Sequence, residues 1–170
     1  MFEIAAPTTA TLDSVTPRTE RHGDEHVFAI SLGLTAALPN RLLEAIAPGL
    51  LVSLYVPDDE QPTLDGVEKI ASKRRVRDVD EVKLATKLEG WTLKVEHGLA
   101  GVIELSSCRV DKLRVTPLEG GSCKVQFRVS TTDINPERCG LLCAKIGDEV
   151  TVGLLAPTLD DDAAPPSGDA

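Results

Sequence analysis

The chain has 170 residues, of which 42 % are hydrophobic and 26 % charged, enough to bury one ordinary core. No apolar run approaches the ~20 residues that cross a bilayer, and the first residues do not resemble a signal peptide. We therefore expect a globular, cytoplasmic protein without a membrane partner. The net charge of −9 weighs against sequence-independent binding of nucleic acid. A local basic face is still compatible with this net charge.

The first part of the chain, residues 9–57, is predicted to form a ββαβ unit. Residue spacing, the turn at Gly23 and the breakers Pro48-Gly49 support this order. In chain order we expect a strand, a turn, a returning strand, a short helix and a closing apolar strand, at residues 9–21, 22–25, 27–34, 39–49 and 50–56.

The middle of the chain changes character twice. Residues 58–80 are acidic, then rich in turn residues, then basic and acidic again, which predicts a mobile insert. Residues 81–98 alternate on both sides of Glu89-Gly90, which predicts a hairpin.

Residues 103–157 repeat the first pattern. Strands are expected at 103–115 and 123–129, followed by a helix from Asn135-Pro136 to Gly147 and a closing strand at 150–155. Residues 158–170 have almost nothing to bury, so they are predicted to be a disordered acidic tail.

The two units resemble each other in detail. Each has a Thr-Pro pair, at 16–17 and 116–117, and a glycine ten positions after a shared aspartate, at Gly23 and Gly121. We therefore predict an α+β fold in a single domain, residues 1–157. It would be mainly an antiparallel sheet or partly open barrel, built from two pseudo-symmetric ββαβ units with two short helices.

Candidate catalytic and metal-binding groups are sparse. Cys139 and Cys143 fall on the apolar stripe of the predicted helix, and the cysteine spacing matches no zinc motif, which favours buried free thiols. His22 and His26 flank a polar turn without a third ligand. No nucleophile elbow or phosphate-binding loop occurs. We therefore predict that the protein is not an enzyme and has no metal or cofactor.

One basic cluster has the right chemistry for phosphate, residues 73–77. The alternative is a solvated loop balanced by flanking acids. Aromatic residues able to stack on bases are few. Phe28 and Phe127 are expected in the core, and the other candidates, Trp91 and Tyr55, are also compatible with core positions. The predicted nucleic-acid-binding residues are Lys73, Arg74, Arg75, Arg77, Trp91 and Tyr55.

The acidic tail has two interpretations. It is either a solubilising end or a partner-binding segment through Asp160, Asp161 and Asp162. The second resembles the acidic tails with which bacterial single-strand binding proteins recruit partners, but this chain lacks their terminal hydrophobic residue.

Several short stretches resemble small early-region proteins of tailed bacteriophages. They are Val15 to Val27, Pro39-Asn40, Leu42-Leu43, Gly90 to Leu93, His97 to Leu99, Ile103 to Leu105, Cys108 and Glu119 to Gly121. The resemblance covers most of residues 9–157 and implies a setting of phage replication and homologous recombination. It carries no catalytic residues.

These observations favour a non-enzymatic phage accessory protein that binds single-stranded DNA or the recombination and replication machinery. One alternative is an acidic phage protein that binds and inhibits or redirects a host protein, such as a nuclease or defence factor. Another is a structural subunit that forms homo-oligomers through strand edges.

Overall fold

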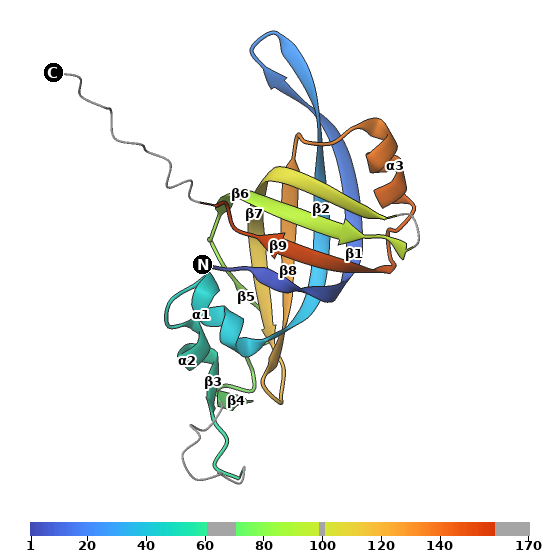
Figure 1. The fold of residues 1–170 in the computed structure, drawn as a ribbon. Helices are drawn as coiled ribbons and strands as arrows, with labels where there is room; N and C mark the ends of the chain where they lie inside the picture. The colour runs from blue at the N-terminus through green and yellow to red at the C-terminus, as the bar shows by residue number, and fades with distance from the viewer. Residues whose placement is uncertain (61–70, 99–100, 159–170) are drawn as a thin grey trace, which may run out of the picture.

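Six antiparallel strands form a closed barrel with a small lobe at one end (Figure 1). The computed structural model describes residues 1–60, 71–98 and 101–158. The barrel strands are β1 (Ile4–His22), β2 (Glu25–Pro39), β6 (Leu88–Glu96), β7 (Val102–Pro117), β8 (Ser122–Thr131) and β9 (Glu149–Leu155). Their order around the barrel is β7, β6, β9, β1, β2, β8, and pairing of β8 with β7 closes it. The predicted α+β class with a barrel of antiparallel strands is confirmed.

The hydrophobic core fills the barrel because the strands alternate between apolar and polar residues. On β8, Cys123, Val125, Phe127 and Val129 point inward and are almost completely buried. The residues between them point outward, so β8 presents a polar face to the outside of the barrel. That outer face carries the candidate site described below.

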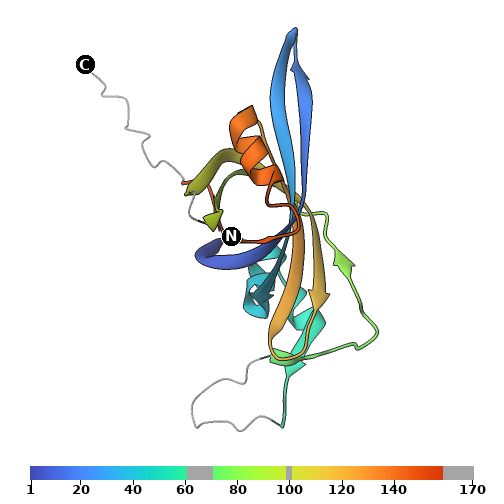
Figure 2. The same cartoon turned by 90° about the vertical axis from the view of Figure 1, so that its right-hand side faces the viewer.

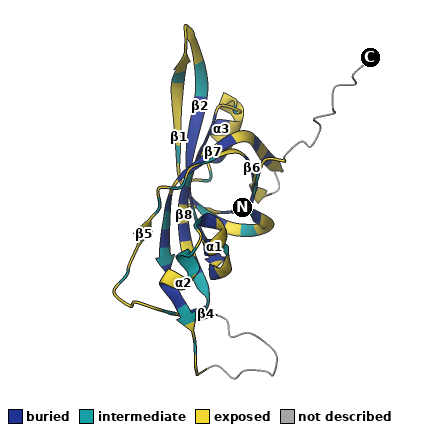
Figure 3. Cartoon of the chain, turned by 90° about the vertical axis from the view of Figure 1, so that its left-hand side faces the viewer, coloured by how far each residue is buried: buried dark blue, intermediate teal, exposed yellow. Residues whose placement is uncertain are grey.

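Strands β1 and β2 continue past the barrel as a two-stranded arm, residues 16–29. β1 pairs with β9 only as far as Thr11, and β2 pairs with β8 only from Ile30 onward. The two strands pair with each other up to His22 and Glu25, around the predicted turn. In Figures 1 and 2 the arm and the lobe project from opposite ends of the barrel. Figure 3 shows that the outer part of the arm is mostly exposed.

The predicted helix after Asn135 is confirmed as α3 (Pro136–Cys143). Asn135 caps it, since its Oδ1 accepts a hydrogen bond from Arg138 N at 2.8 Å. Cys139 and Leu142 are buried, and the helix packs against β1. Cys143 is exposed because the helix turns its other side to solvent, so only half of the predicted buried face is buried.

A lobe of short elements follows β2. It consists of η1 (Asn40–Leu42), α1 (Leu43–Ile46), α2 (Leu50–Leu54), β3 (Tyr55–Pro57) and β4 (Ala71–Arg74). Backbone hydrogen bonds join it to the β7–β8 turn, from Asn40 N to Gly121 O and from Gly120 N to Ser72 O. The lobe is therefore fixed to the barrel end by main-chain contacts.

The predicted strand at 50–56 is wrong, because most of it is the helix α2. Gly49 adopts a left-handed conformation with φ 83°, and its carbonyl accepts hydrogen bonds from Ser53 N and Ser53 Oγ. A short apolar run has no clear period, so the sequence pattern does not separate a helical turn from a buried strand.

The predicted mobile insert, residues 58–80, contains a strand. β4 pairs antiparallel with β3, with Tyr55 opposite Arg74. Residues 61–70 lie outside the described residues. The basic residues therefore begin on an ordered two-stranded sheet.

The predicted hairpin at 81–98 is also wrong. β5 (Val82–Lys83) and β6 both pair with β7, one after the other along the same strand. Gly90 has φ 85° within β6, where the register with β7 shifts, so this glycine forms a bulge and not a turn.

The two halves differ in their last strand. β9 lies in the barrel between β6 and β1, whereas the corresponding segment of the first half is α2 and β3 in the lobe. The internal duplication stays a prediction. Among the described residues, no helix has the length and apolar character needed to span a membrane.

Candidate nucleic-acid interface

Cations from separate parts of the sequence meet on the outside of the barrel, where β1, β2, β8 and β7 lie side by side. Arg128 on β8 pairs with Gly33 on one side and Asp111 on the other. On β1, Thr16 lies opposite Ser31 of β2. A cavity of about 350 Å³ lies on this face; we call it the cationic groove. It is lined by Ser14, Thr16, Arg18, Ser31, Gly33, Lys112, Arg114, Gln126, Phe127 and Arg128.

Two bulges shape the groove. One lies on β1 between Leu12 and Ser14, and one on β7 between Asp111 and Arg114. In the second, Lys112 has φ 52°, an uncommon conformation for a lysine. It is exposed while Leu113 stays fully buried, so the bulge turns a cation outward without disturbing the core.

Gly33 forms part of the floor of the groove. A Cβ atom at this position would lie 2.6 Å from Ser14 Oγ, which is too close for a normal contact. The absence of a side chain therefore leaves room for the Ser14 hydroxyl beside the cations.

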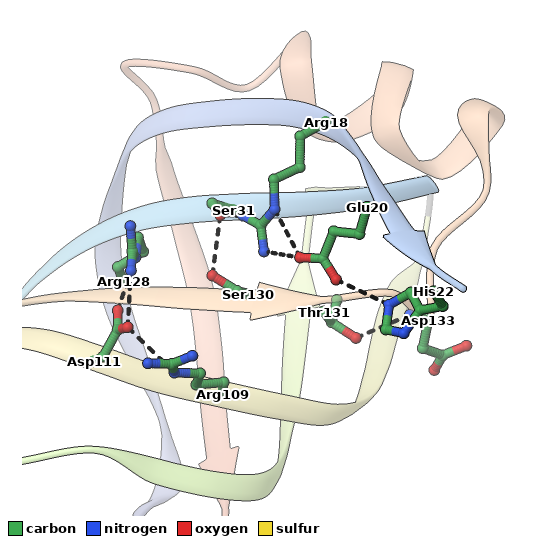
Figure 4. A network of polar contacts seen from close by, with 10 residues as sticks. All are labelled: Arg18, Glu20, His22, Ser31, Arg109, Asp111, Arg128, Ser130, Thr131 and Asp133. Atoms are coloured by element: carbon green, nitrogen blue, oxygen red, sulfur yellow. Dashed lines mark hydrogen bonds and ion pairs between the residues drawn. The ribbon is translucent and has the colours of Figure 1, made fainter. Parts of the chain in front are cut away.

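A buried carboxylate holds the far wall of the groove (Figure 4). Asp111 is only 4 % exposed, and its two oxygens accept hydrogen bonds from Arg128 Nε and Nη2 at 2.7 and 2.8 Å. Arg109 Nε lies 3.4 Å from the same carboxylate. The hydrogen bonds from Arg128 lower the pKa of Asp111 below its ordinary value, and the same pair raises the pKa of Arg128. Arg128 is therefore held in place by the pair.

Arg18 connects the groove to a second cavity of about 200 Å³. Its guanidinium donates to Ser31 Oγ and to Glu20, and Ser31 Oγ lies 3.0 Å from Ser130 Oγ. The hydrogen bonds from Arg18, and then from His22, lower the pKa of Glu20. The second cavity is lined by Arg18, Glu20, Ser107, Arg109, Ser130, Thr131 and Thr132.

The lining of the two cavities is strongly cationic. Its charged residues are five cations, Arg18, Arg109, Lys112, Arg114 and Arg128, and one acid, Glu20. Asp111 neutralises part of this charge from below, and Glu81 lies 3.6 Å from Arg114. Lys112 and Arg114 still present their charge to the groove in a chain whose net charge is −9.

The predicted basic run lies in the lobe and is partly used for structure. Arg74 Nη2 donates to the carbonyl oxygens of Arg77 and Val79, each at 2.7 Å. Arg75 Nε donates to the carbonyl oxygen of Val52 at 2.8 Å. Lys73 and Arg77 are exposed. The structure does not bring this run together with the cationic groove.

Both aromatic residues predicted to stack on bases are buried. Trp91 is 6 % exposed and donates from Nε1 to the carbonyl oxygen of Phe2 at 2.9 Å. Tyr55 is 1 % exposed, and its hydroxyl donates to the Ser122 carbonyl oxygen at 2.7 Å. Neither ring has a face free for a base, so their expected stacking role does not fit this structure. Burial also raises the pKa of Tyr55.

Three of the four cysteines are buried free thiols. Cys108, Cys123 and Cys139 are buried, and burial raises the pKa of Cys108 and Cys123 to about 11. Within residues 1–60, 71–98 and 101–158, no three His, Cys, Asp or Glu side chains form a cluster able to hold a metal ion. The predicted partner-binding residues Asp160, Asp161 and Asp162 lie outside the described residues.

The sequence patterns did not predict the groove cations because they are scattered along the chain. The closest two, Lys112 and Arg114, are separated by the buried Leu113, so they form no continuous basic run. The available signal was alternation, since β8 places Lys124, Gln126 and Arg128 at every second position between buried residues. Alternation does not predict the order of the strands. That order places β2 between β1 and β8, so that Arg18 of β1 lies on the same face as the β8 side chains.

We compared the chain with models of protein families, with curated proteins and with solved structures, and none of them matches.

Proposed function

We propose that the protein is a non-enzymatic accessory of DNA metabolism that binds single-stranded DNA along the cationic groove. The observation that carries the proposal is the gathering of five cations on the two cavities, against Glu20 in their lining and the neighbouring acids Asp111 and Glu81, within an acidic chain. Cations gathered in this way displace counterions condensed on a phosphate backbone, which gives most sequence-independent affinity. The phage replication and recombination setting remains part of this proposal.

The shape of the site favours a single strand over a duplex. The cations lie on β1, β8 and β7, with β2 between β1 and β8, and strands in a sheet are rotated relative to one another. A duplex stays straight over a distance far longer than a small domain, since its persistence length is about 150 base pairs. A flexible single strand follows such a surface without that bending cost.

The test compares two variants that lose the same charge. The groove variant is Arg18→Gln/Lys112→Gln/Arg114→Gln, and the matched variant is Arg41→Gln/Lys73→Gln/Arg77→Gln. The matched set lies in and beside the lobe at exposed positions. Binding of a labelled oligothymidylate is measured by fluorescence anisotropy over a series of salt concentrations.

We expect the native chain and the matched variant to bind with the same salt dependence. The groove variant should lose most of the binding and the salt dependence. Loss in the matched variant alone would move the site to the basic run. Absence of binding in the native chain at low salt would reject single-stranded DNA as the ligand.

A second candidate function, docking on a protein partner, is favoured by the arm. In the arm, β1 after Thr11 and β2 before Ile30 pair only with each other among the described residues, so each strand has a free outer edge. Such edges accept an added strand, from a replication or recombination protein, a host protein or a second copy of this chain. Deleting residues 20–21 and 26–27 shortens the arm by two residue pairs and keeps its turn. This candidate predicts that the deletion abolishes partner capture or self-association, measured by pull-down and light scattering.

A further inference from the structure

The lining of the cationic groove contains groups that recognise phosphate and sugar, but no exposed aromatic ring. Its donors are the guanidinium and ammonium groups named above, the hydroxyls of Ser14, Thr16 and Ser31, and the side-chain amide of Gln126. Phe127 also lines the groove, but it points into the barrel and is 1 % exposed. A ring buried to that extent does not stack on a base.

The same holds for the rest of the chain's aromatic residues. The sequence has one Trp, one Tyr and three Phe, and all five belong to the described residues. Phe2, Tyr55, Trp91 and Phe127 are buried, and Phe28 is half-buried against the core. Phe28 does not line the groove, so the aromatic stacking by which most sequence-tolerant proteins hold single strands has no platform in this site.

We propose that the groove recognises a strand through its sugar–phosphate backbone and makes no aromatic stacking contact with the bases. This inference rests on the proposed function and narrows its ligand to a flexible phosphodiester chain, with or without bases. Phosphate contacts position a strand and carry no sequence information. Binding should therefore be insensitive to base identity and even to removal of the bases.

The number of available cations sets the strength of the salt dependence. Arg128 is committed to Asp111, whereas Lys112, Arg114 and Arg18 border the groove. Arg18 also donates to Glu20, and Arg114 lies 3.6 Å from Glu81, so a phosphate competes with an acid for these two cations. Three phosphate contacts on a single strand give a slope of about −2 for log affinity against log salt. Bases that stacked would add affinity independent of salt.

The experiment compares an oligothymidylate with an abasic oligonucleotide of equal length, in which stable tetrahydrofuran units replace every nucleoside except the labelled end. Anisotropy is measured for the native chain, the groove variant and the matched variant. We expect the abasic strand to bind within about threefold of the oligothymidylate, because the bases make no aromatic stacking contact that their removal would lose. The groove variant should bind both oligonucleotides more weakly, with the same fold loss of affinity for each.

A weakening of more than tenfold on removing the bases would overturn the inference and leave the proposed function intact. Failure of the oligothymidylate itself to bind would reject the proposed function first. The two failures are therefore separated in one experiment.

Discussion

The cationic groove and the basic run of the lobe differ in what their arginines do. In the run, Arg74 and Arg75 lie next to each other in sequence, yet both donate to backbone carbonyl oxygens of the lobe. In the groove, Lys112 and Arg114 come from a different strand than Arg18, yet they line one cavity. The number of cations in a stretch of sequence therefore does not measure the charge available to a ligand. The order of the strands determines which cations share one surface.

The largest expected effect breaks the wall of the groove. Arg128→Ala leaves the Asp111 carboxylate buried without its two hydrogen bonds from Arg128, and should cost about 3 kcal/mol of unfolding free energy. Urea unfolding measures it. Lys124→Ala, at an exposed position of the same strand, is the control and should change stability by less than about 0.5 kcal/mol. Equal stability of the two variants would contradict the role of the pair.

A smaller effect is expected from the run. Arg74→Ala removes two hydrogen bonds to the carbonyl oxygens of Arg77 and Val79, and should cost about 1–2 kcal/mol of unfolding free energy. The affinity for oligothymidylate should not change, because Arg74 acts inside the lobe. A weaker affinity in a variant that remains folded by circular dichroism would return the run to the binding site.

Lowering the pH should remove the stability that the Asp111–Arg128 pair contributes to the folded chain. The pKa of Asp111 is lowered in the folded chain, so its contribution to stability is complete above the unfolded value of about 4. It is lost as the pH falls through the lower, folded pKa, where the carboxylate takes up a proton and the pair with Arg128 weakens. Asp111→Asn should flatten this part of the profile. Melting temperatures measured between neutral and strongly acidic pH test this, and parallel profiles would argue against it.

The smallest expected effect concerns the groove floor. Gly33→Ala places a Cβ 2.6 Å from Ser14 Oγ, so the hydroxyl must move aside, and oligothymidylate binding should weaken by about threefold. Ser14→Ala should have the same effect, and the double variant should be no weaker than either single one. Additive losses in anisotropy titrations would mean that Gly33 and Ser14 do not act through the same hydroxyl.

Much of the barrel follows from local signals. The β1–β2 and β7–β8 hairpins alternate and turn at glycines, and Asn135-Pro136 begins α3 as its cap requires. Two predictions were wrong: the run after Gly49, which has no clear period, is helical, and Gly90 forms a bulge within a strand although the alternation on both sides of it predicted a turn. In both cases packing against the rest of the chain decides the backbone, and a short window of sequence does not contain that information.

The candidate site was predictable only in its chemistry. Phosphate-binding cations were expected, but the location at Lys73 to Arg77 followed sequence density, and the stacking residues Tyr55 and Trp91 are core residues. Arg18 and Arg114 are far apart in sequence, and only the pairing of β1 with β2, β2 with β8 and β8 with β7 brings them to one face. That strand order depends on long-range contacts.

The most direct test of the groove as the ligand site is an amide chemical-shift titration of the native chain with oligothymidylate. We expect the largest shifts at outward positions of β1, β2, β7 and β8, including Thr16, Gly33, Arg114 and Gln126, with β4 unaffected. Shifts concentrated on residues 71–77, with the β7–β8 face unchanged, would contradict it.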